Sequence, residues 1–428
     1  MEEKFLYHIW DEGHLSPELM TVSGKKLKII YHGQYNTGRG PDFKNAIIEI
    51  GGEQLRGDVE IHLKTRDWQA HHHHEDQYYN RVILHVVLEH KASYTHTIRE
   101  DGVLVEILML QDKLSEDITK LLVAHETPHR RSVYCDLLSA LPDDNLKSIL
   151  HQAGMRRFKG KIARFNSALS MSSFDQLFYE GIFEALGYHN NKLNTLQLAQ
   201  TLSLDILQEF KAEGMSKAEL AAIYVCASGM LKAKTTIIDE ALQHKLWQLY
   251  ESQTYYARKI AIDWQFFRIR PQNHPLKRIL YISDLIWENL DKGLLHHFII
   301  NTSPFADDPA RHYKAFNALW QNSEIFEGNA QSIGMGVRDN IYLNILLPVL
   351  DLYYQKMAMD TRPIELLYRD FPGLQANHIT RFMSGYMNEN QGKLVNTKAI
   401  YQQGLLDIYH RYCNWHLCSE CLKLARRD

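Results

Sequence analysis

The stretch from Leu55 to Lys64 constrains the fold more than any other part of the chain, because apolar and charged side chains alternate along it. This period of two predicts a β-strand whose side chains on one face stand roughly 7 Å apart. Carboxylates beside an imidazole and an ammonium can hold a divalent cation and activate a water. The polar face therefore gives four candidate catalytic residues: Asp58, Glu60, His62 and Lys64.

Further elements with strand or helix patterns surround this stretch. An amphipathic helix is expected over residues 3–10, and strands over Lys25–Tyr31, Phe43–Ile50, Gln54–Lys64, Val82–Glu89 and Val103–Leu110. Gly51-Gly52 is a strong hairpin-turn signal between two of the strands. After about residue 112 the periodicity becomes helical. We therefore predict an α+β protein: a mixed-sheet α/β domain over residues 1–112 and a larger all-α domain over 113–428, with the boundary between Gln111 and Pro142.

The spacing of acids around the central strand resembles the PD-(D/E)xK nuclease core. Pro41-Asp42 is followed, after seventeen residues, by Glu60-Ile61-His62. The resemblance implies a restriction-endonuclease-like fold in which Asp42 and Glu60 bind Mg²⁺ or Mn²⁺. His62 stands where that family has a lysine that orients the attacking water, and Lys64, on the same face, is the alternative ammonium.

The position of Asp42 requires an irregularity in the hairpin. A two-residue turn at Gly51-Gly52 pairs Phe43 with Glu60, which places Asp42 opposite Ile61 on the apolar face. Asp42 reaches Glu60 if a β-bulge or a kink at Pro41 redirects it, or if the turn includes Glu53.

A second resemblance, to an uncharacterised bacterial family of about this length, extends over nearly the whole chain. It rests on Asn36, Gly40–Phe43, Gly57–His62, Asp67-Trp68, His71, His73, Asp76, Tyr79, Leu84–Val87, Arg270–Pro275 and the cysteines Cys413, Cys418 and Cys421. Membership of that family implies no particular activity.

Histidines are concentrated in the first quarter: of 23, eleven precede residue 97. His71–His74 lie among acids, and on a helix His71 and His74, or His72 and Asp76, would share a face. A solvated polar turn is the alternative interpretation, and His85, in an apolar strand, is also typical of a buried core residue. The candidate metal ligands in this region are Asp42, Glu60, His71, His73, Asp76 and His85.

Charge and hydropathy exclude some classes of protein. The net charge is −3 and the sequence pI about 6.8, so a nucleic-acid partner would need a local basic patch. The candidates are Arg156, Arg157, Lys161 and Arg164 on one helix, with Arg268 and Arg270 further on. No apolar run approaches the ~18 residues of a membrane span, and the N-terminus lacks a signal-peptide pattern. A cytoplasmic location is expected.

Three of the five cysteines, Cys413, Cys418 and Cys421, lie in the last sixteen residues. With His410 or His416 they fit a tetrahedral Zn²⁺ shell, provided that the helix ends near Cys413. With Cys135 as the fourth ligand they fit an iron–sulfur cluster. Free thiols on a C-terminal helix are the third interpretation.

Three functions are consistent with these patterns. The first is a metal-dependent nuclease, the second a non-catalytic nucleic-acid-binding or interaction protein that keeps the nuclease fold, and the third a metal hydrolase built on the histidine cluster. Geometry separates them, because proximity of the Asp42 and Glu60 carboxyls favours the first and convergence of His62, His73 and His85 favours the third.

Overall fold

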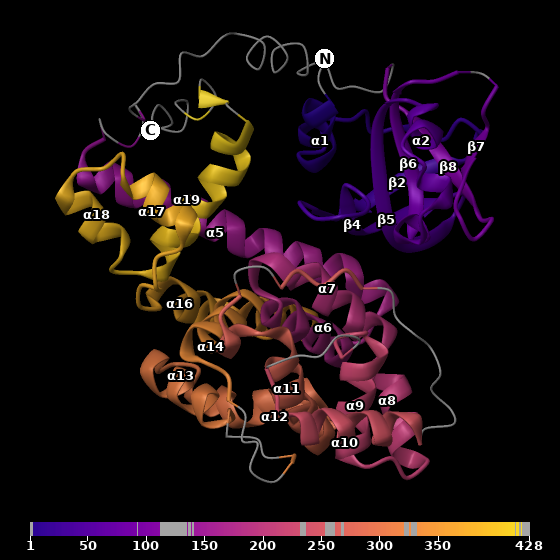
Figure 1. Cartoon of the computed structure of the whole chain (residues 1–428). Helices are drawn as coiled ribbons and strands as arrows, with labels where there is room; N and C mark the ends of the chain where they lie inside the picture. The colour runs from indigo at the N-terminus through magenta and orange to yellow at the C-terminus, as the bar shows by residue number, and fades with distance from the viewer. Residues whose placement is uncertain are drawn as a thin grey trace. The chain divides into compact units, whose positions relative to one another are not determined.

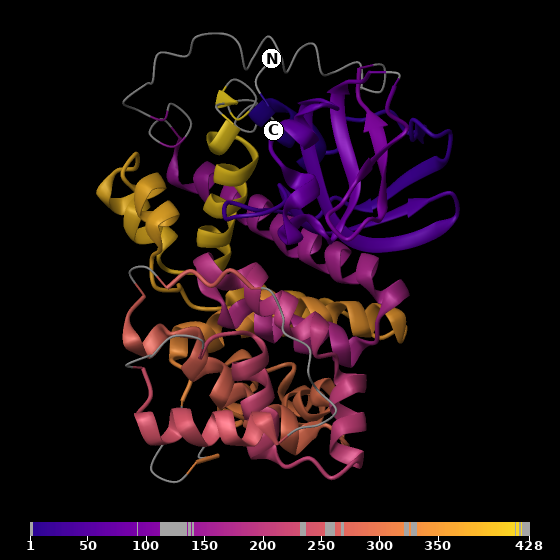
Figure 2. The same cartoon turned by 45° about the vertical axis from the view of Figure 1, so that its right-hand side comes forward.

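The computed structural model describes residues 3–91, 93–111, 135, 138, 141–231, 237–252, 262–266, 269–320, 325–326, 332–415, 417–418 and 421. The chain forms two compact units, one of residues Met1–Arg157 with Ala376–Asp428, and one of Phe158–Gln375. The predicted α+β class is confirmed, with a curled mixed sheet first and helices after it (Figures 1 and 2). Most of the predicted boundary region, Gln111 to Pro142, lies outside the described residues.

The first unit contains an eight-stranded sheet in the order β1-β2-β4-β5-β6-β8-β7, with β3 paired to β4. The five predicted strands are present as β2 (Lys26–Tyr31), β4 (Phe43–Ile50), β5 (Glu53–Lys64), β6 (Val82–Glu89) and β8 (Leu104–Met109). Three short strands were not predicted: β1 (Leu19–Met20), β3 (Gln34–Tyr35) and β7 (His96–Ile98). β5 lies at the centre, antiparallel to β4 and parallel to β6.

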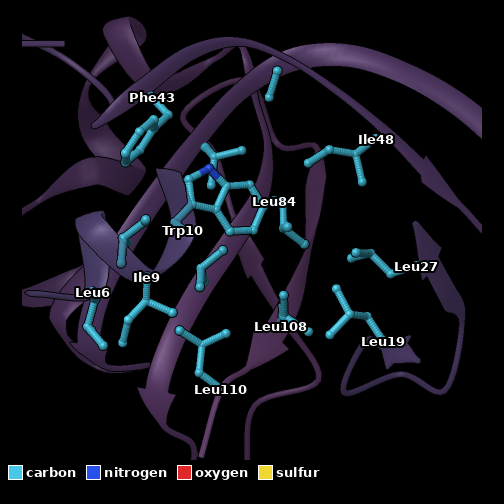
Figure 3. Packing of buried hydrophobic residues seen from close by; sticks show 14 of the residues in the cluster. Leu6, Ile9, Trp10, Leu19, Leu27, Phe43, Ile48, Leu84, Leu108 and Leu110 are labelled. Atoms are coloured by element: carbon cyan, nitrogen blue, oxygen red, sulfur yellow. The ribbon is translucent and has the colours of Figure 1, made fainter. Parts of the chain in front are cut away.

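One face of this sheet packs on helix α1 (Glu3–Asp11), which is the predicted N-terminal helix. Leu6, Ile9 and Trp10 of α1 are fully buried against the sheet (Figure 3). The apolar residues of β5, Val59 and Ile61, belong to the same cluster. The apolar side chains of β5 therefore face α1, as the alternation predicts. Its polar side chains point to the opposite face of the sheet.

The helical part of the first unit contains the start of α5 (Asp143–Ala168) together with α17 (His378–Ser384), α18 (Glu389–Val395) and α19 (Ala399–Arg411). Leu146 and Leu150 of α5 share one hydrophobic cluster with Ile379 of α17 and Leu405 of α19. α19 lies in the region where helical periodicity was expected, after about residue 112.

The second unit continues α5 and is helical (Figure 1). Helix α6 begins after Ser173, whose hydroxyl accepts from the Gln176 N–H, and ends before Gly187. None of the described helices is both long and apolar enough to cross a membrane. The further helices are α7 (Tyr188–Thr201), α8 (Leu204–Ala212), α9 (Lys217–Ala227), α10 (Glu240–Glu251), α11 (Pro275–Asn289), α12 (Leu294–Thr302), α13 (Pro309–Ala318), α14 (Met335–Ile341), α15 (Leu347–Lys356) and α16 (Arg362–Asp370).

Candidate metal centre

A β-bulge in the β4–β5 hairpin places Asp42 beside Glu60. Ala46 pairs with Gly57 but Phe43 pairs with Val59, so one extra residue of β4 lies between these pairs. Asn45 takes a left-handed conformation (φ 65°), which asparagine adopts more readily than most residues. The Asn45 N–H donates to buried Asp58 Oδ1 (2.9 Å), which holds the bulge in place. The predicted irregularity is therefore present, at Asn45 rather than at Pro41.

The two acids are tied together through the backbone. The Asp42 N–H donates to Glu60 Oε2 (3.1 Å), and the Ile61 N–H donates to Asp42 Oδ2 (3.0 Å). The carboxyl groups also hydrogen-bond each other. These bonds fix Glu60 with its second oxygen, Oε1, available for other contacts.

The connection from β5 to β6 covers the polar face of the sheet. It consists of three short helices: α2 (Asp67–Ala70), η1 (His73–Glu75) and η2 (Gln77–Tyr79). Between α2 and η1, His72 is left-handed (φ 60°), so the histidine run is not one continuous helix and the expected pairing of His71 with His74 does not form. Instead His71 and His73 share a cluster, while His72 and His74 stack on each other.

Three imidazole nitrogens and one carboxylate oxygen converge beneath this connection. His62 Nε2 lies 3.1 Å from His71 Nδ1 and 3.3 Å from Glu60 Oε1. His73 Nε2 lies 3.1 Å from the same Glu60 oxygen, and among the described residues this buried nitrogen makes no hydrogen bond of good geometry. Ligand atoms of His62, His71 and His73 all lie within 4.8 Å of one another.

Part of this set has the spacing expected around a single cation. Zn²⁺ at about 2.0–2.1 Å from four nitrogen or oxygen ligands holds neighbouring ligand atoms about 3.3–3.4 Å apart. His62 lies at about this distance from His71 and Glu60, and His73 from Glu60, whereas the mutually close group within 4.8 Å consists of the three imidazoles. His71 is exposed whereas His62 and His73 are buried, so one side of the set is open to solvent.

The electrostatics of the set lack a positive charge. Burial and the neighbouring Glu60 charge raise the pKa of Asp42 to about 8, and burial raises the pKa of Glu60 to about 8. Burial also lowers the pKa of His62 to about 2 and that of His73 to about 4, so these imidazoles are neutral near pH 7. A bound cation would supply the missing charge and favour the ionised carboxylates.

His85, Trp68 and Tyr79 contact the candidate ligands His62 and His73 and hold them in place. His62 Nδ1 lies 2.9 Å from Nε2 of fully buried His85. If His62 donates this bond, its Nε2 keeps the lone pair that a metal requires. Tyr79 stacks on His73 with ring centroids 3.8 Å apart, and the Trp68 ring contacts both His73 and His85. His85 thus orients a ligand instead of joining the cluster.

The other predicted site residues of the sheet have different partners. Asp58 Oδ1 accepts from the Asn45 N–H of the bulge, and Arg81 Nε lies 3.8 Å from its second oxygen. Lys64 is half-exposed at the end of β5, where its Nζ lies 3.5 Å from Glu89. Asp76 accepts from the Tyr78 N–H (3.0 Å) and pairs with Arg39 (3.0 Å).

The four predicted basic residues of α5 are engaged within the protein. Arg156 donates to Asp407 (2.9 Å), and Arg157 donates to Gln403 (2.9 Å). Lys161 contacts Asn344, and Arg164 donates to Glu184 (2.8 Å). Arg270 is exposed, and Arg268 lies outside the described residues.

Two features of the site were missed in the sequence. Tyr7 of α1 hydrogen-bonds Asp42 and also donates to Glu3 (3.0 Å), and nothing in the spacing of α1 indicated this role. His62 was assigned to the position of a charged lysine, but it lies among the metal-ligand candidates. The signal for this was available, because residues i and i+2 of a strand, here Glu60 and His62, share a face.

Comparison with known proteins gives a family but no activity. The sequence matches the family described as "Protein of unknown function (DUF2851)" over residues 3–369. Neither the curated proteins nor the solved structures contain a match. Since the matched region is most of the chain, the protein belongs to this family of unknown function.

Proposed function

We propose that this protein is a metal-dependent hydrolase of phosphodiester bonds, that is, a nuclease acting on DNA or RNA. The observation that carries the proposal is the convergence of Asp42, Glu60 and three imidazoles on one face of β5. The strand order around β5, antiparallel to β4 and parallel to β6, is compatible with the resemblance to the PD-(D/E)xK core.

The ligand types select the class of cation. Glu60, His62, His71 and His73 would hold it. Imidazole ligands suit Mn²⁺, Zn²⁺ or Fe²⁺, whereas Mg²⁺ takes oxygen ligands and keeps several waters. Of the two cations that the resemblance implies, we therefore propose Mn²⁺, with Zn²⁺ as its competitor.

Each residue has a separate role in the proposed reaction. When bound, the cation would lower the pKa of a coordinated water and polarise a phosphoryl oxygen. Without metal the pKa of Asp42 is raised to about 8, so its carboxyl is mostly protonated near pH 7; a bound cation would favour the carboxylate, which is the form that can accept the proton of that water. Tyr7 and the Ile61 N–H keep that carboxyl in place.

His62 does not replace the lysine of the nuclease pattern. Its low pKa leaves it neutral, and the Lys64 ammonium is directed to Glu89. The positive charge near the site belongs instead to Arg39, which lies over the Tyr78 ring at 4.2 Å and is half-exposed. Arg39 precedes Gly40-Pro41-Asp42, so it can meet an anionic substrate that approaches the acids.

The test is a cleavage assay with matched substitutions. Full-length protein is incubated with labelled single- and double-stranded DNA and RNA in Mn²⁺, Mg²⁺ or Zn²⁺. Glu60→Gln and His73→Ala should abolish cleavage together with metal binding. Asp42→Asn should abolish cleavage while much of the metal binding persists, because Asp42 acts on the water.

Glu75→Gln is the control, since Glu75 is an exposed acid of the same connection that contacts His72 and His74 and not the proposed ligands His62, His71 or His73. It should cleave like the wild type. No cleavage of any nucleic acid with any of the three cations would contradict the nuclease proposal.

The imidazole-rich ligand set also favours a second candidate, a metal hydrolase with a different substrate. Hydrolysis of bis(p-nitrophenyl) phosphate or p-nitrophenyl acetate, lost in Glu60→Gln but without cleavage of nucleic acid, would identify it. Metal binding without any hydrolysis would favour a non-catalytic binding protein.

A further inference from the structure

Four of the five cysteines gather in the first unit, away from the sheet site in sequence. Cys421 belongs to the hydrophobic cluster of α5, α17 and α19, and Cys135 and Cys413 pack against that cluster. The thiols of Cys413 and Cys421 each interact with those of Cys135 and Cys418. The fifth, Cys226, is in α9 of the second unit and faces the Leu246 carbonyl (3.7 Å). Residues nearly three hundred positions apart are therefore brought together.

The chain turns after α19, which the spacing of Cys413, Cys418 and Cys421 requires if their sulfur atoms are to converge. Helix α19 ends at Arg411, and a single 3₁₀ turn, η7 (Cys413–Trp415), follows it. The Leu417 N–H donates to the Tyr412 carbonyl (3.0 Å), and the Cys421 N–H donates to the Leu417 carbonyl (3.0 Å). Cys418 and Cys421 are three residues apart, a spacing that places two side chains on one side of a helical turn.

The described cysteines form no disulfide. Cysteine binds a metal as the thiolate, and the coordination bonds formed on binding contribute to folding.

The spacing of the sulfur atoms separates the two possible occupants. Four thiolates around one Zn²⁺ stand about 3.8 Å apart, given a Zn–S bond of about 2.3 Å. Among the described residues, no three of these sulfur atoms lie within 4.8 Å of one another. A cluster of several irons spreads its thiolate ligands more widely than a single ion does. His416 lies outside the described residues, and four thiols need no histidine.

We propose that Cys135, Cys413, Cys418 and Cys421 bind an iron–sulfur cluster. The cluster fastens the C-terminal segment to the chain just before α5, and it closes a loop of nearly the whole helical region. Coordination of this kind contributes folding energy directly. The site is independent of the proposed hydrolase centre, which contains no cysteine.

The test is metal and sulfide analysis of the full chain purified without oxygen. We expect iron and acid-labile sulfide in equal amounts, with visible absorption from thiolate-to-iron charge transfer. Cys418→Ser should lose the iron and lower the melting temperature, although Cys418 is exposed and its thiol fills no core space. Cys226→Ala, the control in the other unit, should keep the iron.

Three results would overturn parts of the inference. One zinc per chain without sulfide would exclude the cluster, and four freely titratable thiols in the protein as purified without oxygen would exclude the site. A melting temperature unchanged in Cys418→Ser would exclude the fastening role. Glu60→Gln should keep the iron while it loses the metal at β5, so failure of one site is distinguishable from failure of the other.

Discussion

Glu60 in the sheet and Glu184 in helix α6 are both buried carboxylates, but they are neutralised in different ways. Arg164 donates to both oxygens of Glu184 (2.8 and 2.9 Å), and Lys192 Nζ lies 2.9 Å from one of them. Burial would raise the pKa of Glu184, but these two cations outweigh it and lower the pKa to about 2. Glu60 has neutral imidazoles and a second acid around it, and its pKa rises to about 8.

By this difference Glu184 is a structural carboxylate, whereas Glu60 has the environment of a carboxylate that binds a ligand. The protein itself supplies the counter-charges of Glu184, so its ionised form stabilises the fold. No cation of the described residues is paired with Glu60, and its charge is compensated when a metal binds. This contrast makes opposite predictions for the same chemical substitution at the two positions.

The largest expected effect is on Glu184→Gln. Removing the carboxylate leaves the partly buried Arg164 without its counter-charge, which costs about 3–5 kcal/mol in the free energy of unfolding. Glu60→Gln in metal-free protein should be unchanged or more stable, because it removes repulsion from Asp42. Urea unfolding of both variants measures the two values. A similar loss in both would end the distinction.

The next effect is the stabilisation that metal confers. At a metal concentration one hundred times the dissociation constant, the wild type should gain about 2.7 kcal/mol in the free energy of unfolding. Glu60→Gln should gain nothing, whereas Glu75→Gln should gain as much as the wild type. Thermal melts with and without Mn²⁺ or Zn²⁺ test this, and a full gain in Glu60→Gln would place the metal elsewhere.

The strands and the acids of this site followed from a local pattern, but their final geometry did not. A period of two identifies β5 and the face of Glu60 and His62, because strand geometry is set by nearest neighbours. The bulge that moves Asp42 onto that face depends on the left-handed Asn45 and on its bond to buried Asp58. Such a bond forms only after the strands have paired.

Contacts that the local sequence does not determine account for the remaining differences between the predicted and the observed site. Arg164 was a candidate phosphate ligand, but Glu184, twenty residues further on, already engages it. The histidine run allowed a helix, and a left-handed residue at His72 turns alternate imidazoles inward instead. Neither the ion pair nor the turn is determined by the residues next to it in sequence.

The dependence of stability on pH gives a further test of the comparison, because Glu60 and Glu184 contribute slopes of opposite sign. The pKa of Glu60 is raised, so the folded state binds more protons than the unfolded state up to about pH 8. Metal-free stability should therefore fall by about 1.5 kcal/mol for one proton between pH 6.5 and pH 8. His62 and His73 have lowered pKa values, so they titrate near pH 6.5 only in the unfolded state and add a slope of the opposite sign, which fades above about pH 7.5. The same imidazoles are present in Glu60→Gln with Asp42→Asn, so chemical unfolding of wild type and double variant across this range isolates the carboxyl slope as their difference.

Glu184 should have its effect at the other end of the pH scale. Its pKa is lowered, so the stability it gives is complete above its unfolded value, near 4.5, and is lost as the pH falls toward 2. A slope between pH 6.5 and pH 8 that vanished in Glu184→Gln would contradict the assignment.

Asp58 is the intermediate case, an acid on the same strand whose partners come from the chain. Its Oδ1 accepts from the Asn45 N–H, and Arg81 is near its other oxygen. Asp58→Ala leaves a buried N–H without an acceptor, which costs about 1–3 kcal/mol, whereas Asp58→Asn keeps an acceptor oxygen and should cost less. Loss of the bulge would also turn Asp42 toward the apolar face, since a one-residue slip reverses every side chain. Asp58→Ala should therefore reduce cleavage more than metal binding, and Asp58→Asn should restore most of it. Equal activity in wild type and Asp58→Ala would show that the bulge does not position Asp42 for the reaction.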